Sequence, residues 1–302
     1  MKEWLAYALV WFVLKTVGAM PRPLARATGA SVARMLLRLS PKLKKTAEFN
    51  LRLAFPEWSD AQRAATLRGM ARSLGWMAAE FALMPRYTRQ TIEEVVVLDG
   101  HENFLAGQRR GKGVLFLTAH LGAWELSSYA HALYGHALHY MARPLDNARL
   151  DALVNRYRGL SGNQPIFKNE SARAMLKILK DAGTVGILAD QNTMPEEGLF
   201  VDFFGTPACT SAGIARVALH TGAAVVPGYA VWDEELGKYR LRFEPPLELV
   251  RTGDAERDIL LNTGRFAKVT EEIIRKYPDQ WVWVHARWKT RPRGESPLYD
   301  FL

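Results

Sequence analysis

Two residues of this sequence, His120 and Glu125, have the types and the spacing of a general acid–base pair. A neutral imidazole can accept a proton near neutral pH. A carboxylate bonded to one ring nitrogen fixes the tautomer, so that the other nitrogen acts as the base. On one continuous helix, residues five apart point about 140° away from each other. The two side chains can therefore meet only if the chain turns between them, and Gly122 permits such a turn.

The residues around this pair indicate a strand, a tight turn and the start of a helix. The uncharged apolar run 113–119 leads directly into His120, which is typical of a buried parallel strand. A helical pattern begins at 124–126, and the helix dipole keeps a carboxylate in the first turn ionised. The alternative is a core histidine at a strand end beside a glutamate that only favours the helix start. The spacing alone does not choose between these two interpretations.

Polar residues also follow two later strands. A short strand at 138–141 is followed by Arg143, and the apolar strand 184–189 is followed by Asp190 and Gln191. In open α/β sheets, ligands bind outside the carboxyl ends of the strands, so we expect these side chains to line one cleft with His120. Arg143, beside a proline-stiffened loop, suits a phosphate or carboxylate group; its alternative role is an ordinary surface ion pair.

Composition excludes several classes of protein. Cys209 is the only cysteine of the 302 residues, so neither an intramolecular disulfide nor a cysteine zinc site can form. The chain has no Gly-x-Ser-x-Gly elbow and no phosphate-binding Gly-x4-Gly-Lys-Ser/Thr loop. The histidines at 131, 136 and 139 lack standard metal-ligand spacing, so we expect no metal site. The formal charge of +9 suits an anionic partner. The basic residues are spread along the chain without a nucleic-acid motif, so no nucleic-acid partner is expected.

The N-terminus combines an apolar segment with a basic one. Residues 4–20 are apolar and end at Pro21, but their length is marginal for a bilayer span, which takes about 17–25 residues, and Lys15 interrupts them. Basic side chains then recur up to Lys45 before the next acid, and residues 24–39 are amphipathic, as in an interfacial helix. We predict a membrane anchor and basic amphipathic segment at 1–45, followed by a catalytic domain at 46–302. The alternative for 24–39 is an ordinary core helix with a solvated basic face.

Other stretches predict the elements that complete the fold. The tail 280–293 alternates Trp with Arg, which suits either a membrane interface or a strand-like cap whose tryptophans pack in the core. Residues 200–205 are expected to be an apolar loop that packs under the site or wraps an apolar ligand, and Thr210 is expected to cap the next helix. Helices are predicted at 59–84, 101–110, 148–158, 169–181, 211–220 and 255–277, and strands at 95–98, 223–231 and, antiparallel, at 239–243.

Taken in order, these motifs resemble those of the lipid A biosynthesis late acyltransferases, the lauroyl/myristoyl transferases of the lysophospholipid acyltransferase superfamily. The resemblance covers nearly the whole chain. It implies an α/β fold of the glycerolipid-acyltransferase type, with a mixed, mostly parallel sheet flanked by helices and an N-terminal hydrophobic anchor helix. The motifs are Thr118-Ala-His-Leu-Gly-Ala-Trp-Glu125, Arg143-Pro-Leu-Asp-Asn147, Asp190-Gln191, Phe200-Val-Asp-Phe-Phe-Gly-Thr-Pro207 and Gln280-Trp-x-Trp-x-His-x-Arg-Trp-Lys289.

The resemblance also assigns residues. The wider superfamily uses His-x4-Asp and this branch His-x4-Glu, so His120 and Glu125 are the implied catalytic pair. The positions implied for substrate binding and site support are Gly122, Arg143, Asn147, Asp190 and Gln191. No metal and no resident cofactor is implied.

The expected reaction is acyl transfer from a thioester of acyl carrier protein or coenzyme A to a hydroxyl of an anionic glycolipid, a lipid A precursor. His120 would act as general base oriented by Glu125. No serine or cysteine nucleophile stands beside the pair, so we expect direct attack without an acyl-enzyme. Backbone amides near Gly122, or Arg143, would stabilise the oxyanion. The expected location is the inner membrane, single-pass or peripheral, with the catalytic domain in the cytoplasm.

Two alternatives stay open. One keeps the chemistry and changes the acceptor to a phosphatidylinositol mannoside, another glycolipid or a lysophospholipid. The other is a basic membrane-tethered binding protein without enzymatic activity.

Overall fold

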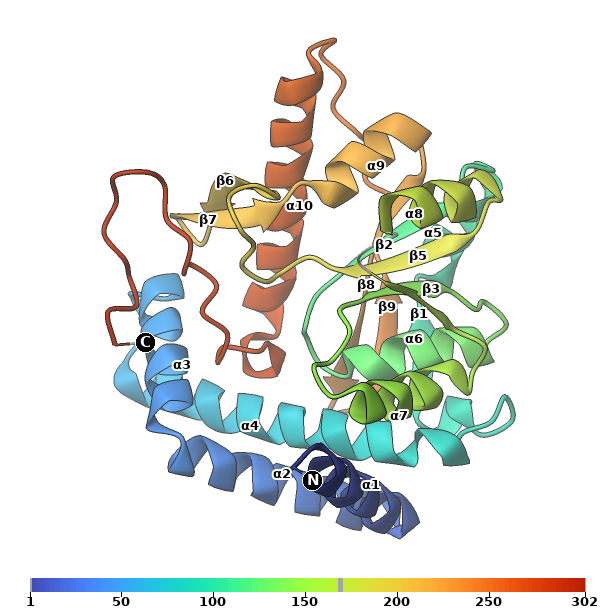
Figure 1. The fold of residues 1–302 in the computed structure, drawn as a ribbon, viewed down its shortest axis with the longest axis vertical. Coiled ribbons are helices and arrows are strands. Elements are labelled where there is room, and N and C mark those ends of the chain that lie inside the picture. The colour runs from blue at the N-terminus through green and yellow to red at the C-terminus, as the bar shows by residue number, and fades with distance from the viewer. Residues whose placement is uncertain (1, 168–170, 302) are drawn as a thin grey trace.

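The fold is built on a mixed sheet whose neighbouring strands are mostly parallel (Figure 1). The computed structural model of the chain describes residues 2–167 and 171–301. Strand β9 is antiparallel to β8 and parallel to β1, whereas all other neighbours run parallel, as expected. In spatial order the strands are β1 (Val96–Asp99), β9 (Lys238–Phe243), β8 (Ala224–Asp233), β2 (Val114–Thr118), β5 (Thr184–Leu188), β3 (His139–Ala142) and β4 (Gln164–Phe167).

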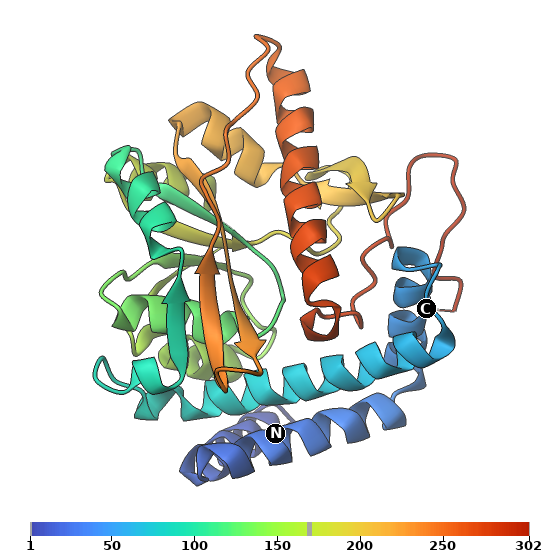
Figure 2. The ribbon, with the colours of Figure 1, turned by 180° about the vertical axis from the view of Figure 1, so that it is seen from behind.

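Helices cover both faces of the sheet. Successive residues of the central strand β2 point to opposite faces, and both sets are buried, so each face needs a covering layer. Phe116 packs in the core beneath α5 (His101–Arg109) and α6 (Trp124–Leu133). Leu115 and Leu117 pack in the core on the other face, which α8 (Ser171–Lys180), α9 (Gly213–Thr221) and α10 (Ala255–Lys276) cover (Figure 2). The start predicted for the helix 169–181 lies outside the described residues.

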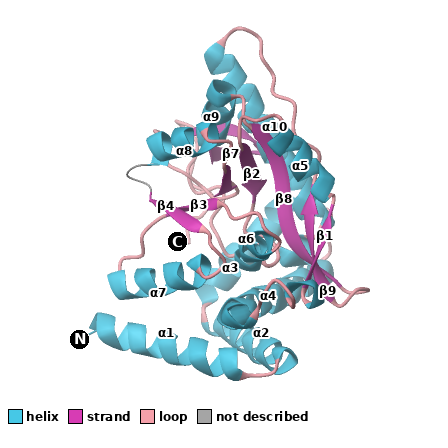
Figure 3. Cartoon of the chain, turned by 90° about the vertical axis from the view of Figure 1, so that its right-hand side faces the viewer, coloured by secondary structure: helices cyan, strands magenta, loops and turns pink. Residues whose placement is uncertain are grey.

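The four N-terminal helices lie at the bottom of the molecule, where α1 and α2 form an outer layer below α4 and α3 stands at one end of α4 (Figures 1 and 3). They are α1 (Lys2–Ala19), α2 (Arg22–Leu39), α3 (Pro41–Ala54) and α4 (Asp60–Leu83). A reciprocal capping box between Ser59 and Gln62 starts α4. Gly29 of α2 meets Gly75 of α4 so closely that a Cβ at Gly29 would lie 2.2 Å from the Gly75 carbonyl oxygen. None of the helices among the described residues is both long and apolar enough to span a bilayer. The division of the chain at residue 45 stays a prediction.

A buried ionic cluster ties α2 to the sheet. The guanidinium of Arg26 packs against two tryptophan rings, 3.5 Å from the centroid of Trp76 and 3.8 Å from that of Trp232 in β8. Beside it the fully buried Glu80 of α4 forms an ion pair with Arg22 at 2.8 Å. Burial is tolerated here because the carboxylate and the cations compensate each other and the rings bind the second guanidinium.

Two predictions near residue 205 are wrong. Residues 200–205 are not a loop: β6 (Gly198–Phe203) and β7 (Thr206–Ser211) form an antiparallel hairpin. Its two turn residues, Phe204 and Gly205, have positive φ angles of 56° and 75°, as tight hairpin turns require. Thr210 does not cap a helix, because it belongs to β7 and α9 begins only at Gly213. The stretch 200–205 is apolar because alternate side chains of β6, those of Val201 and Phe203, point into the core.

The tryptophans of the C-terminal tail pack in the core, which was one of the two predictions for this segment. Trp281, Trp283 and Trp288 are fully buried in one cluster with α3, α4 and α10. The side chain of Asn50 in α3 donates hydrogen bonds to the carbonyl oxygens of Trp283 and His285, both at 2.7 Å. The tail is therefore part of the core and not a membrane-facing strip.

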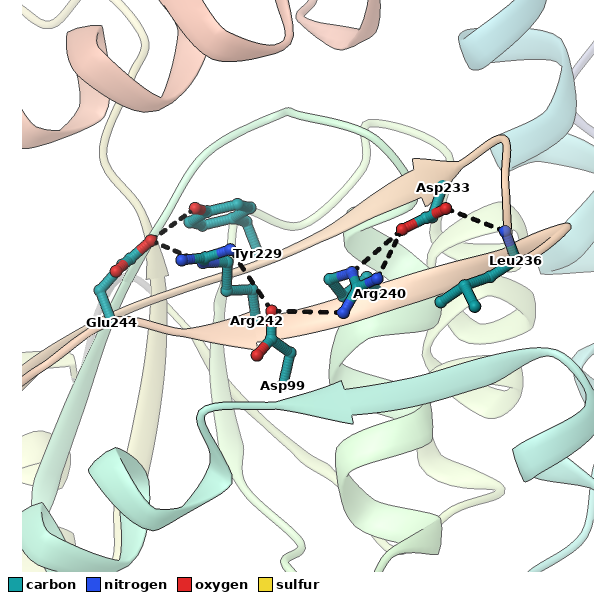
Figure 4. A network of polar contacts seen from close by, with 7 residues as sticks. All are labelled: Asp99, Tyr229, Asp233, Leu236, Arg240, Arg242 and Glu244. Carbon is teal, nitrogen blue, oxygen red and sulfur yellow. Dashed lines mark hydrogen bonds and ion pairs between the residues drawn. The ribbon is translucent and has the colours of Figure 1, made fainter.

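A polar network holds the sheet at the β1 edge (Figure 4). Arg240 of β9 pairs with Asp233 of β8 at 2.7 Å and reaches Asp99 of β1 at 3.7 Å. Arg242 pairs with Asp99 and with Glu244. These pairs join three strands at a solvent-facing position, so their role is structural.

The remaining elements are short or peripheral. Asn147 accepts hydrogen bonds from the backbone N–H groups of Arg149 and Leu150 and so caps α7 (Ala148–Gly159), while its side-chain amide donates to the carbonyl oxygen of Glu3 in α1. Figure 3 shows α7 between α1 and the β3–β4 edge of the sheet. The bounds of the 3₁₀ turns are Met84–Arg86, Ile92–Glu94 and Pro278–Gln280.

Candidate active site

The imidazole of His120 is held by the carboxylate of Asp190. Nδ1 of His120 lies 2.9 Å from Oδ1 of Asp190, and the backbone N–H of His120 donates to Oδ2 at 2.9 Å. The indole N–H of Trp281 donates to the same Oδ2 at 2.7 Å. Asp190 is 1% exposed, and three donors compensate its burial. The arrangement fixes both the position of the ring and the nitrogen that carries the proton.

Strand register explains why these two residues meet. Strands β2 and β5 pair in parallel with Val114 opposite Thr184 and Thr118 opposite Leu188. Continued two residues further, the same register sets His120 opposite Asp190. The polar side chains at these two strand ends therefore meet, while the expectation that they line one cleft together with Arg143 stays a prediction.

The electrostatics of the pair favour the charged forms. Burial works against charge on the His120 ring, but the neighbouring Asp190 outweighs it, and Glu125 adds to the effect, so the pKa of His120 is raised. Burial also works against the Asp190 carboxylate, and His120 and Trp281 more than offset it, so the pKa of Asp190 is lowered. Asp190 is therefore a permanent anion that increases the basicity of the imidazole.

Glu125 does not occupy the position expected for it. Its carboxylate forms a two-pronged ion pair with the guanidinium of Arg158 in α7, in which Nε donates to Oε2 at 2.8 Å and a second guanidinium nitrogen donates to Oε1. The predicted hydrogen bond between Glu125 and His120 is therefore corrected: Asp190 holds Nδ1. The physical reason is that the chain turn at 121–123 sets Glu125 toward α7, where a cation of matching shape is available.

Gly122 is required by the turn itself. Its φ angle is +59°, and a Cβ there would lie 2.0 Å from the carbonyl oxygen of Ala230. The amides nearby are already used: Gly122 N–H donates to Gln280 and Ala123 N–H to Ala230, both at 2.9 Å. The expectation that amides near Gly122 stabilise an oxyanion is therefore wrong for Gly122 and Ala123. In the next turn, the amides of 124–126 open α6 without a side-chain cap.

The other predicted residues divide into two groups. Gln191 lies at the site, with its Nε2 3.4 Å from Nε2 of His120, the ring nitrogen that Asp190 leaves free. Arg143 is exposed in the loop after β3, and Asn147 is engaged in capping α7. No contact among the described residues joins either of them to His120, so their roles in substrate binding stay predictions.

A largely apolar pocket opens beside the pair, between α6 and the sheet. Trp124, Glu125 and Arg158 line it together with Thr118 and Leu188, the last residues of β2 and β5. The ring of Trp124 packs edge-on against His120 with centroids 5.3 Å apart, so the imidazole adjoins this mouth. Further in, the pocket is lined mainly by Phe116, Leu138, Tyr140, Leu241 and Phe243. Its lining suits an apolar ligand with a polar group at the mouth.

The histidines considered for a metal site do not form one. Among the described residues, no three His, Cys, Asp or Glu side chains come together in a way that could hold a metal ion. His131 and His136 instead pack against the ring of Phe104, with centroid distances of 4.7 and 5.0 Å.

Sequence reasoning missed Arg158 and Trp281 as site residues. Arg158 lies 33 residues from Glu125, and Trp281 lies 91 residues from Asp190, so neither pairing has a local pattern. The pairing of His120 with Asp190 did have a signal. Gly113 and Gly183 each precede an apolar strand, and each strand is followed by a polar residue seven positions after its glycine.

Comparison with known proteins gives a consistent result over the whole chain. The sequence profile of the family described as "Bacterial lipid A biosynthesis acyltransferase" matches residues 1–290. The chain is 27% identical to the lipid A biosynthesis lauroyltransferase of Escherichia coli (strain K12), over 98% of this chain and 94% of that one. It is 26% identical to the palmitoleoyltransferase of the same organism, over 97% and 95%. It is also 26% identical to the myristoyltransferase, over 89% and 82%. The His–Asp pair beside an apolar pocket and this full-length similarity lead to one conclusion: the chain is an acyltransferase and belongs to the bacterial lipid A biosynthesis acyltransferase family.

Proposed function

We propose that this enzyme transfers a fatty acyl chain from a thioester to a hydroxyl of a lipid A precursor by direct attack, with no acyl-enzyme. The observation that carries the proposal is the position of His120. Its Nδ1 is bound by a buried carboxylate, and its ring adjoins the mouth of an apolar pocket. Acyl transfer to a hydroxyl needs this combination of an oriented base and a site for an apolar chain.

His120 acts as the general base. With Nδ1–H donated to Asp190, the lone pair of Nε2 accepts the proton of the acceptor hydroxyl as its oxygen bonds to the thioester carbonyl carbon. The tetrahedral species then collapses, the carbon–sulfur bond breaks, and the imidazolium returns its proton to the departing thiolate. Asp190 stabilises the imidazolium throughout, the role a carboxylate has in hydrolase triads.

Arg158, positioned by Glu125, stabilises negative charge. This is either the charge that develops on the thioester carbonyl oxygen during attack or the charge of a phosphate group on the acceptor. Arg158 lines the pocket mouth, and Glu125 positions it while raising the pKa of His120. The first-turn amides of α6, which no side chain caps, lie at the N-terminus of the helix that carries Glu125. Backbone N–H groups at a helix N-terminus stabilise anions. In this proposal Glu125 is essential through Arg158 and through its charge, not by holding the imidazole.

The N-terminal helices attach the enzyme to the bilayer. Most of the exposed large hydrophobic side chains among the described residues lie between Trp4 and Leu43. A groove between α1, α2 and α4 is lined almost entirely by apolar residues. With the basic residues of 22–45, this surface suits an anionic membrane. We propose peripheral attachment at the cytoplasmic face of the inner membrane, with acyl carrier protein or coenzyme A thioesters as donors and no resident cofactor or metal.

One assay tests the function. Purified enzyme is incubated with acyl carrier protein and coenzyme A thioesters, each with a lipid A precursor that lacks secondary chains, a phosphatidylinositol mannoside or a lysophospholipid. Acylated products are detected by mass spectrometry. We expect product on the lipid A precursor with wild type and none with His120→Ala. Acylation confined to another acceptor, or equal product with His120→Ala, contradicts the proposal.

A further inference from the structure

The floor of the pocket is built from two glycines. Gly186 of β5 and Gly228 of β8 both line it, on either side of Phe116 in β2. A glycine inside a strand often marks a place where another group approaches the backbone closely. A Cβ added at Gly186 would lie 3.6 Å from Cδ1 of Leu138, an ordinary contact, so alanine fits there and narrows the pocket. At Gly228 a Cβ would lie 3.2 Å from the Phe116 ring, which is tight.

His131 of α6 lines the pocket on the opposite side from this floor. It is 2% exposed, and neither of its ring nitrogens makes a hydrogen bond of normal geometry among the described residues, although the backbone of His136 lies close enough to interact with it. Burial, with smaller contributions from His136 and His101, lowers its pKa to about 3, so the ring is neutral at physiological pH. An imidazole that lines an apolar pocket without such a hydrogen bond is unusual, because buried polar atoms normally have partners.

The ring of His131 is held in place. It packs edge-on against Phe104 and Phe116, with centroids 4.7 and 5.0 Å apart, and lies 5.3 Å from His136 and 5.6 Å from Phe243. Packed aromatic side chains on several sides leave it little room to swing away when a ligand enters.

We propose that His131 and Gly186 gauge the acyl chain of the donor: the chain runs over Gly186 and ends against His131. The inference rests on the proposed function, because it takes this pocket as the acyl site. A chain of fitting length just reaches the imidazole. A longer chain has to push against a ring that is packed on several sides, and its methylene groups offer the buried nitrogens no hydrogen bond. A tenfold or larger loss of kcat/KM beyond the fitting length is expected.

Two substitutions with opposite effects test the gauge. Initial rates are measured with a series of saturated acyl thioesters that lengthens two carbons at a time, on a lipid A precursor. His131→Ala removes the stop, so the ratio of kcat/KM for the next longer donor to that for the preferred one should rise about tenfold. Gly186→Ala narrows the floor, so the preference should shift toward shorter chains. His220→Ala, an exposed histidine of α9 on the other face of the sheet, is the control and should keep the wild-type profile.

The outcomes separate the two proposals. If the wild-type enzyme transfers no chain of any length, the proposed function is wrong. If it is active and both variants are active with an unchanged chain-length profile, the gauge is wrong. If His131→Ala does not fold, Gly186→Ala still decides, because a profile that does not move toward shorter chains overturns the proposal.

Discussion

Replacing Asp190 by asparagine is the sharpest test of the site, because it removes a charge and reverses one hydrogen bond while keeping the shape. Oδ2 accepts two N–H groups, from the His120 backbone and the Trp281 indole, whereas Oδ1 faces only Nδ1 of His120. The amide oxygen therefore takes the Oδ2 position, and the NH₂ group faces the imidazole. Nδ1 then has to accept, so the ring proton moves to Nε2, where the base is needed.

The expected loss follows from this tautomer change. The equivalent exchange in a Ser-His-Asp triad lowers turnover about 10⁴-fold. A loss of about 10³- to 10⁴-fold in kcat corresponds to about 4–5.5 kcal/mol of transition-state stabilisation. The free energy of unfolding should fall by less than about 3 kcal/mol, because two of the three hydrogen bonds persist and a buried charge is removed.

The pH dependence gives a second readout. The base works only when His120 is neutral, so activity falls as the pH drops through its pKa, which Asp190 and Glu125 raise above the ordinary value of 6.5 against the effect of burial. Without Asp190 the opposing effect of burial dominates, and the acid limb of the remaining activity should move to lower pH.

The assay is initial-rate acyl transfer across pH, with thermal unfolding as the measure of folding. The matched control is Asp202→Asn, an exposed aspartate of β6, which should match wild type in rate, pH profile and stability. A folded Asp190→Asn enzyme with near-wild-type kcat and an unmoved acid limb would refute the assignment of Asp190 as the residue that orients the base.

Three further expectations follow from the structure. Glu125→Gln and Arg158→Ala should each lower kcat at least tenfold, and the double variant should lose little more than either single one, because the pair acts as a unit; additive losses in a double-mutant cycle would contradict this. Glu80→Ala should lower the free energy of unfolding by about 2–4 kcal/mol in urea titrations, because the guanidinium groups of Arg22 and Arg26 lose their anion. The control is Glu57→Ala, at an exposed position. An equal effect of the two substitutions would show that the cluster is not stabilising. The double change Trp11→Ser and Phe12→Ser, at exposed positions of α1, should weaken binding to anionic phospholipid vesicles at least tenfold in a sedimentation assay. The reason is that each side chain of this size contributes about 1.5–3 kcal/mol when it is buried. Leu260→Ser on α10 is the control and should bind like wild type, and unchanged binding of the α1 variant would exclude that helix from the membrane contact.

Local patterns were sufficient to predict much of the fold. The apolar runs at 113–119 and 184–189 became β2 and β5, and the alternating stretch at 239–243 became the antiparallel β9. These predictions succeeded because a strand buried on both faces has to be apolar throughout, and a half-exposed strand has to alternate. The predictions at 200–205 and Thr210 failed because the apolar residues there face a core supplied by α10 and the tail, which no local window contains.

The candidate site shows the same division. His120, Asp190 and Gln191 were identified from their place at strand ends, which is a topological rule that needs no side-chain geometry. The same rule could not predict which side chain pairs with each charged residue of the site. Glu125 could reach either the imidazole or a cation, and the choice of Arg158 depends on where α7 lies after the chain has folded.

The amino-acid sequence was enough to single out a histidine at a strand end, the strands on either side of the site and a basic, apolar N-terminus, because each of these depends on residue type and short-range spacing. Which carboxylate holds the imidazole, which amides are already occupied and where a glycine floor meets a buried histidine depend on strand register and helix packing. These arise from contacts between residues tens to hundreds of positions apart, and their energies are set by burial and by geometry that exists only in the folded chain.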